Sequence, residues 1–131
     1  TGHCILLIKA SQVFQDPTFL HAAQDIAERI LWPRGLLHKG VGLCHGISGN
    51  AFIFLALSEA LQHTDATPWQ GRALQYTHFA LTHLSELENT PDHPYSLYEG
   101  MGGLCALLLS CAMSLAQDSH GRAFKFPLYD F

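Results

Sequence analysis

Hydrophobic residues along the chain gather in five long stretches, and within each stretch their spacing is helical rather than alternating. Residues 19–32 and 69–87 are amphipathic, with apolar residues on one side and charged or polar residues on the other. Residues 2–14, 50–62 and 101–116 are apolar almost all round, which is typical of helices surrounded by protein. The pattern therefore predicts an all-α protein of about five helices.

The two amphipathic stretches also predict which side chains lie together on each helix. In residues 19–32, helical spacing places these residues along one side: Phe19, Ala22, Ala23, Ile26 and Ile30. In residues 69–87, it groups a second set: Leu74, Thr77, His78, Leu81 and Leu84. We expect these two sides to face the rest of the protein.

A glycine motif repeats ahead of two of the apolar helices. Residues 46–49 and 100–103 both have glycine at their first and last positions, and an apolar helix follows each. Gly2, followed by residues 3–10, resembles the end of a third copy. Each unit then consists of a glycine loop, an apolar inner helix, a turn and an amphipathic outer helix. Two and a half such units fit part of a two-layered helical ring, although the pattern alone also permits a globular bundle.

Composition and charge mainly exclude classes of protein. The 131 residues suffice for one small domain with a core, and 48% of them are hydrophobic whereas 14% are charged. The net charge of −4 and the 7 Lys and Arg residues leave no basic patch, which excludes a nucleic-acid-binding protein. No apolar run reaches about 18 residues, which excludes a membrane-spanning segment. The four cysteines form no disulfide framework, so we expect a reducing, cytoplasmic compartment.

The candidate chemistry lies in residues 39–50, where Cys44 and His45 stand side by side among four glycines. In a glycine-rich loop that enters a helix, two neighbouring side chains can converge, whereas on a helix they diverge by about 100°. A thiolate and an imidazole are ligands that zinc prefers. The alternative is a buried cysteine in a helix-capping turn, beside a histidine without a role, because adjacent Cys and His are a weak metal signal.

Two segments, GLCHGISGNAFIFLAL and HPYSLYEGMGGLCALLL, resemble the last two signature segments of the lanthionine synthetase C-like family. The resemblance extends over residues 1–131 and implies the C-terminal part of a single domain, an α/α toroid. It also implies one zinc ion held by two cysteines and one histidine, with Cys44 and His45 at two of these positions. The third ligand is expected upstream of Thr1, so we expect this chain alone to be incomplete and inactive.

The resemblance implies roles for three further loop residues. Lys39 matches a position that holds the carboxylates of glutathione, with a solvated loop lysine as the alternative. Asn89 stands where family members can carry an arginine, which weakens the expectation of unchanged substrate binding. Glu99 matches a recurrent glutamate, for which we favour a role in capping backbone amides of the glycine loop. The alternative is that Glu99 orients a zinc ligand from the second shell of the site.

The other cysteines are expected in the core, because each lies in an apolar helical stretch. Cys4 falls on an apolar helix position, with a substitute zinc ligand as the less favoured interpretation. Cys105 and Cys111 are six residues apart, about 240° round a helix, so they do not share a face.

We therefore expect zinc-dependent addition of a thiol to dehydroamino acids, similar to a glutathione transferase or a lanthionine-forming enzyme. The partners that the resemblance implies are glutathione and a dehydrated peptide or protein, with peripheral association at the plasma membrane left open. Two alternatives are a zinc- or glutathione-binding or protein-interaction module without turnover, and an inactive helical segment. A glycoside hydrolase on the same fold needs two facing carboxylates, for which only Asp92 and Glu99 offer themselves.

Overall fold

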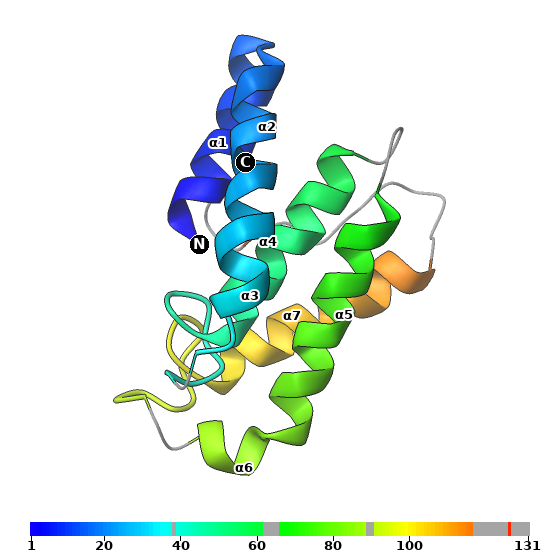
Figure 1. Ribbon diagram of the computed structural model, residues 1–131. Coiled ribbons are helices and arrows are strands. Elements are labelled where there is room, and N and C mark those ends of the chain that lie inside the picture. The colour runs from blue at the N-terminus through cyan, green and yellow to red at the C-terminus, as the bar shows by residue number, and fades with distance from the viewer. Residues whose placement is uncertain (38, 62–65, 89–90, 117–125, 127–131) are drawn as a thin grey trace.

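The computed structural model describes residues 1–37, 39–61, 66–88, 91–116 and 126, and every regular element in these ranges is helical (Figure 1). The described elements are α1 (Gly2–Phe14), α2 (Pro17–Ile26), the π-helical turn η1 (Ala27–Leu31), α3 (Trp32–Arg34), α4 (Ile47–Ala60), α5 (Thr67–Thr82), α6 (Leu84–Leu87) and α7 (Met101–Ala116). The all-α class and the five predicted helical stretches are confirmed, although both amphipathic stretches are interrupted. Within the described ranges, no helix combines the length and the apolar character that crossing a bilayer requires.

Helix α4 is the centre of the arrangement. Figure 1 shows α1 and α2 side by side at one flank of α4, and α5 and α7 at the other. Helix α4 contacts α1, η1, α5 and α7, and every residue of its N-terminal half from Ile47 to Phe54 is buried. The apolar helices α1, α4 and α7 thus form an inner row, covered by the amphipathic helices α2 and α5. This order of layers is the one that the repeated unit predicts.

The second helical stretch buries a different face from the one predicted. Pro17 occupies its first turn, and the Asp16 carboxylate caps it by accepting a hydrogen bond from the Thr18 amide at 2.9 Å. The residues that it buries are Ala23, Ala27 and Leu31. Ile30, predicted on the inner side, is 53% exposed. Ala22, also predicted on the inner side, is exposed as well, although it lies in α2 before the π-helical turn begins. The buried face is therefore shifted by one position along the whole stretch, to residues spaced four apart.

Helix α5 buries a side that overlaps only in part with the one predicted: Thr77 is buried and Leu74 packs against the core, whereas His78 is exposed. Its buried residues are Trp69, Ala73, Tyr76, Thr77 and Ala80. Leu81, predicted on the inner side, is 46% exposed. The small alanines let α5 approach α4 closely, so the contact face is not the one richest in leucine. The helix ends before His83, where the backbone has φ −109° and ψ 20°, and the short helix α6 follows.

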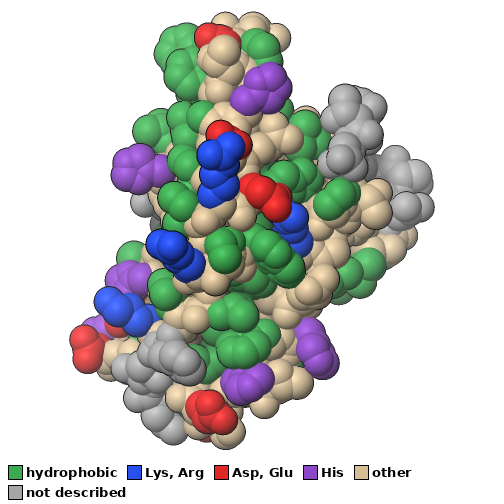
Figure 2. All heavy atoms as spheres, viewed as in Figure 1, with side chains coloured by type: hydrophobic (Ala, Val, Ile, Leu, Met, Phe, Trp, Pro, Cys, Tyr) green, Lys and Arg blue, Asp and Glu red, His purple; other side chains and the backbone are tan. Residues whose placement is uncertain are grey.

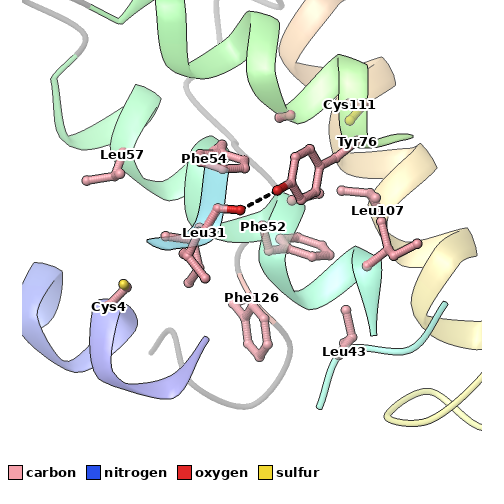
Figure 3. Close-up of a cluster of buried hydrophobic side chains, with 14 of the residues drawn as sticks. Cys4, Leu31, Leu43, Phe52, Phe54, Leu57, Tyr76, Leu107, Cys111 and Phe126 are labelled. Carbon is pink, nitrogen blue, oxygen red and sulfur yellow. Dashed lines mark hydrogen bonds between the residues drawn. The ribbon is translucent and has the colours of Figure 1, made fainter. Parts of the chain in front are cut away.

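Tyr76 joins α5 to the end of the second helical stretch (Figure 3). Its hydroxyl shares one hydrogen between the carbonyl oxygens of Leu31 and Trp32, the second at 3.1 Å. The Tyr76 ring also stacks on the Trp32 ring and meets the Phe54 ring edge-on, with centroid distances of 5.9 and 5.1 Å. Burial raises the pKa of Tyr76 to about 12. These contacts hold the outer helices over α4.

Arg72 covers this aromatic cluster on the outside. Its guanidinium lies 5.0 Å from the Trp32 ring centroid and 4.8 Å from the Trp69 ring centroid. It also pairs with Glu28 through two hydrogen bonds, one of them 3.0 Å long. The hydrogen bond from Arg72 lowers the pKa of the Glu28 carboxyl. The pair connects α5 to η1 within the outer layer.

The inner row ends in exposed apolar side chains at both flanks. On α1, Leu6 is 66% exposed and Val13 is 68% exposed, and on α7 the exposed fractions of Leu109 and Leu115 are 50% and 57%. Figure 2 shows hydrophobic side chains at the surface where α1 and α2 lie. The expectation that an all-apolar helix is surrounded by protein therefore holds in this chain for the N-terminal half of α4. On the outward sides of α1 and α7 the apolar side chains are exposed, which an open segment of a helical ring leads one to expect.

Candidate functional site

The two glycine loops lie directly against each other at the N-terminal ends of α4 and α7. A Cβ atom on Gly42 would come within 2.3 Å of the Tyr98 carbonyl oxygen, and one on Gly103 within 2.9 Å of the Gly42 Cα. These distances leave no room for a side chain, so glycine is what permits the approach. The Cys44 amide also donates a hydrogen bond to the Tyr98 carbonyl oxygen at 2.8 Å. The two sequence motifs therefore form one continuous structure.

Helix α4 starts inside its glycine motif, at Ile47 rather than at residue 50. The Ile47 amide donates a hydrogen bond to the Gly40 carbonyl oxygen at 3.2 Å, and the Gly49 amide donates one to the Gly42 carbonyl oxygen at 3.2 Å. Gly40 has a φ of +90°, a conformation that side chains other than glycine disfavour. The loop backbone thus satisfies amides that a helix start leaves without partners.

Helix α7 starts in a similar way. The Met101 amide donates a hydrogen bond to the Pro94 carbonyl oxygen at 2.7 Å. Among the described residues, the carboxylate of Glu99 takes no part in this cap, whereas the Glu99 amide donates a hydrogen bond to the Ser96 hydroxyl at 3.1 Å. The role that we favoured for Glu99, capping amides of the glycine loop, therefore has no support at this helix start.

Cys44 and His45 are both exposed, and they line two neighbouring clefts rather than one. The His45 cleft has a volume of about 340 Å³ and is also lined by Lys39, Asp92 and Glu99. The Cys44 cleft has a volume of about 480 Å³. Its other lining residues include Thr1, Gly2, Ile5, Leu6, Leu43 and Phe126. Tyr98 lines both clefts and therefore stands between them.

The structure thus brings together three of the four predicted site residues, Lys39, His45 and Glu99, and places Cys44 in the adjoining cleft. Exposure of Cys44 contradicts the alternative in which this cysteine is buried. In the part of the chain that the structure describes, no three His, Cys, Asp or Glu side chains cluster closely enough to hold a metal ion. The loop by itself offers only two ligands of a type that suits zinc, the thiol of Cys44 and the imidazole of His45.

The remaining cysteines differ in exposure, and all four cysteines of the chain are free. Cys4 and Cys111 are buried, as predicted. Burial raises the pKa of both thiols, which disfavours the thiolate form that binds metals. Cys105 is exposed, so its predicted place in the core is wrong. The reason is that α7 packs against other helices on one side only within this chain.

Asn50 supports the site and was missed by reasoning from the sequence. It is 4% exposed, and its Oδ1 atom accepts a hydrogen bond from the Thr1 hydroxyl at 2.7 Å. Its Nδ2 atom donates a hydrogen bond to the Gly35 carbonyl oxygen at 2.8 Å. One buried amide therefore ties the start of α1 to α4. The available signal was an asparagine in the first turn of an apolar helix, because a buried amide requires hydrogen-bond partners.

Residues 1–121 match the family model described as lanthionine synthetase C-like protein. The chain belongs to the lanthionine synthetase C-like family. It is 40% identical over 129 residues to a protein of Danio rerio named glutathione S-transferase LANCL1, and this alignment covers 98% of the chain and 29% of that relative. It is 37% identical over 135 residues to the LanC-like protein GCL1 of Arabidopsis thaliana, which covers 99% of the chain and 28% of that relative.

The chain therefore spans less than a third of the length of these two lanthionine synthetase C-like relatives. Its layers of inner and outer helices are consistent with part of a helical toroid. The two segments that suggested the family are those that form the interlocked glycine loops. Asn89, where the resemblance leads one to expect an arginine, lies outside the described residues.

Proposed function

We propose that this chain contributes to a zinc-dependent, glutathione transferase-like addition of a thiol to dehydroamino acids in peptides or proteins. In this proposal Cys44 and His45 are metal ligands, Lys39 binds a carboxylate of glutathione, and Glu99 supports the metal site. The observation that carries the proposal is that Thr1 and Cys44 line the same cleft. In a longer chain, a residue just before Thr1 would lie close to Cys44, where a third ligand is needed.

The donor chemistry of this loop fits zinc in part. An exposed thiol and an exposed imidazole stand at consecutive positions, and both are ligands that zinc favours. When bound, zinc would supply the deprotonation of a thiol at neutral pH, because a coordinated thiol loses its proton. The protein's own contribution is rigidity: the loop is anchored by the Cys44–Tyr98 hydrogen bond and by glycines that other residues cannot replace.

The His45 cleft has the charges that a glutathione molecule requires. Lys39 offers an ammonium group to a carboxylate, while Asp92 and Glu99 offer carboxylates to the ammonium group of the tripeptide. The cleft volume of about 340 Å³ is at the lower end for small-molecule sites, which suits a site that holds part of such a ligand. The name of the Danio rerio relative, a glutathione S-transferase, supports this choice of thiol.

The proposed reaction balances without an oxidant or a reductant. The thiolate sulfur forms a bond to the β-carbon of the dehydroamino acid, and the electrons of the carbon–carbon double bond move toward the α-carbon and its carbonyl group. A proton then adds to the α-carbon and replaces the one lost from the thiol. The product is a thioether, formed by net addition of one thiol across one double bond.

A second candidate is a zinc- or glutathione-binding module without turnover. It is favoured by Asn89, since the resemblance implies that an arginine at this position assists substrate binding. A neutral amide cannot replace the bidentate hydrogen bonding of an arginine to a carboxylate. Weak binding of the second substrate would then leave the metal site intact but unproductive.

The compartment that we propose is the cytoplasm. All four cysteines are free, and glutathione chemistry requires a reducing environment. Cell fractionation with an antibody to the chain tests this proposal, and recovery in the secreted fraction would contradict it.

Zinc content and thioether formation together test the function. The full natural chain that contains residues 1–131 is incubated with glutathione and a dehydroalanine peptide, and the products are measured by mass spectrometry. We expect one zinc ion per chain and a glutathione adduct on the peptide. The variant Cys44→Ala should lose most of the zinc and all of the adduct, because removing a ligand opens the site. Zinc without adduct would favour the binding module, and full zinc in the variant would place the metal elsewhere.

A further inference from the structure

The Cys44 cleft is apolar over most of its wall. Leu43 is fully buried and Phe126 is 7% exposed, and both line the cleft beside Cys44. On the other side, Ile5 and Leu6 of α1 line it, and Leu6 is 66% exposed. The volume of about 480 Å³ lies within the range of ligand-binding pockets. An exposed cysteine therefore opens onto a cleft with apolar walls.

The adjoining His45 cleft has the opposite character. Lys39, Asp92 and Glu99 give it side chains of both charges, and it shares the Tyr98 wall with the Cys44 cleft. A charged ligand such as glutathione gains hydrogen bonds from side chains of both signs in the His45 cleft, whereas Lys9 is the one charged side chain that the described residues place in the wall of the Cys44 cleft. An uncharged dehydroamino acid has no charge to satisfy, and apolar neighbours in its peptide gain from burial.

We infer that the Cys44 cleft binds the electrophile, and that it favours dehydroamino acids flanked by apolar residues. Leu6 and Ile5 are then specificity-determining residues, because their side chains form the wall contributed by α1. The inference rests on the proposed function, in which the thiol arrives from the His45 cleft. The reacting atoms of the two substrates meet at the loop that carries Cys44 and His45. Tyr98 separates the parts of the two substrates that lie away from the reacting atoms.

Leu6 offers the sharpest test, because its side chain is largely exposed and its replacement removes little from the core of this chain. Val13 is the matched control: it lies on the same helix, is 68% exposed and is not part of the cleft wall. The alternative occupant of this wall is another helix of the same protein. In that case Leu6 and Val13 are packing residues of the same kind.

The experiment compares two dehydroalanine peptides, one with leucine and one with serine on both sides, in the full natural chain that contains residues 1–131. For the unmodified protein we expect kcat/KM for glutathione addition to be about tenfold higher with the leucine peptide, as burial of a leucine side chain allows. Leu6→Gln should reduce this ratio by about fourfold or more, whereas Val13→Gln should leave it unchanged. Because the ratio is taken within one variant, differences in zinc content or folded fraction cancel.

The possible outcomes distinguish a failure of this inference from a failure of the proposed function. No adduct with either peptide in the unmodified protein would refute the proposed function. Adduct formation with a ratio near one would overturn the inference alone. Equal ratios in Leu6→Gln and Val13→Gln, with similar losses of thermal stability, would also overturn it and assign the α1 wall to helix packing. Leu6→Ala provides a second variant if Leu6→Gln does not fold, and circular dichroism establishes which variants do.

Discussion

The amide nitrogen of Cys44 donates a hydrogen bond to the carbonyl oxygen of Tyr98 at 2.8 Å. This bond joins the loop before α4 to the loop before α7 at the residue that we propose as a metal ligand. It also places Tyr98 between the Cys44 cleft and the His45 cleft. The geometry of the candidate site therefore depends on the contact between the two loops as much as on either sequence motif.

Gly42 is the point at which this contact is most sensitive. In Gly42→Ala, the new Cβ atom would lie 2.3 Å from the Tyr98 carbonyl oxygen and from the carbonyl carbon of Glu99. We expect the free energy of unfolding to fall by about 1–3 kcal/mol or more, because backbone atoms must move to make room. Gly71→Ala is the control, since nothing lies within 4 Å of its Cβ position in α5. It should raise the free energy of unfolding by about 0.5–1 kcal/mol. Urea denaturation measures both, and equal effects would contradict the close contact.

Two buried hydroxyl groups should respond oppositely to removal. Tyr76→Phe leaves the carbonyl oxygens of Leu31 and Trp32 without the Tyr76 donor, which we expect to cost about 1–3 kcal/mol. The Ser48 hydroxyl is buried and has no hydrogen-bond partner among the residues that the structure describes. Ser48→Ala should therefore be neutral or stabilising, since it removes a buried polar group that gains nothing in the folded state. Chemical denaturation of the two variants is the measurement, and a large loss in Ser48→Ala would reveal an interaction of this hydroxyl.

Alkaline pH should destabilise the chain through Tyr76. Burial raises the pKa of this phenol from 10.0 to about 12, so the folded state favours the neutral form. The stability that the neutral Tyr76 phenol contributes is fully present below pH 10 and is lost as pH rises through about 12. We expect the free energy of unfolding to decline over this window, and Tyr76→Phe to remove that part of the decline. Tyr95→Phe is the matched control for removal of a phenol hydroxyl, because Tyr95 is 86% exposed.

Lys39 should affect substrate binding without affecting the metal. In the full natural chain, Lys39→Ala should keep its zinc and raise the KM for glutathione about 10- to 150-fold, which corresponds to one charge-assisted hydrogen bond of about 1.5–3 kcal/mol. We expect KM rather than kcat to change, because a contact between Lys39 and a carboxylate far from the reacting atoms strengthens binding in the ground state and the transition state alike. Arg34→Ala controls for net charge, since Arg34 is exposed and lies outside the His45 cleft. An unchanged KM would make Lys39 a solvated loop residue.

The amino-acid sequence by itself determined the helices and the two glycine-rich segments by which the family was recognised. Apolar periodicity is a local signal, so the five helical stretches could be predicted from residues that are neighbours along the chain. The glycine positions were equally informative, since the structure places Gly42 and Gly103 where a side chain has no room. Residue type made Cys44 and His45 candidates for zinc ligands, the resemblance of their segment to a known family strengthened that interpretation, and it stays a prediction.

Tertiary structure decided which faces are buried and how the site is divided. Ile30 and Leu81 are exposed although helical spacing groups them with core residues, because the packing of the helices against one another sets the actual contact faces. The separation of Cys44 from His45 into two clefts depends on Tyr98, which approaches from another loop. Such contacts join residues far apart along the chain, and their positions follow from packing in three dimensions rather than from any local preference.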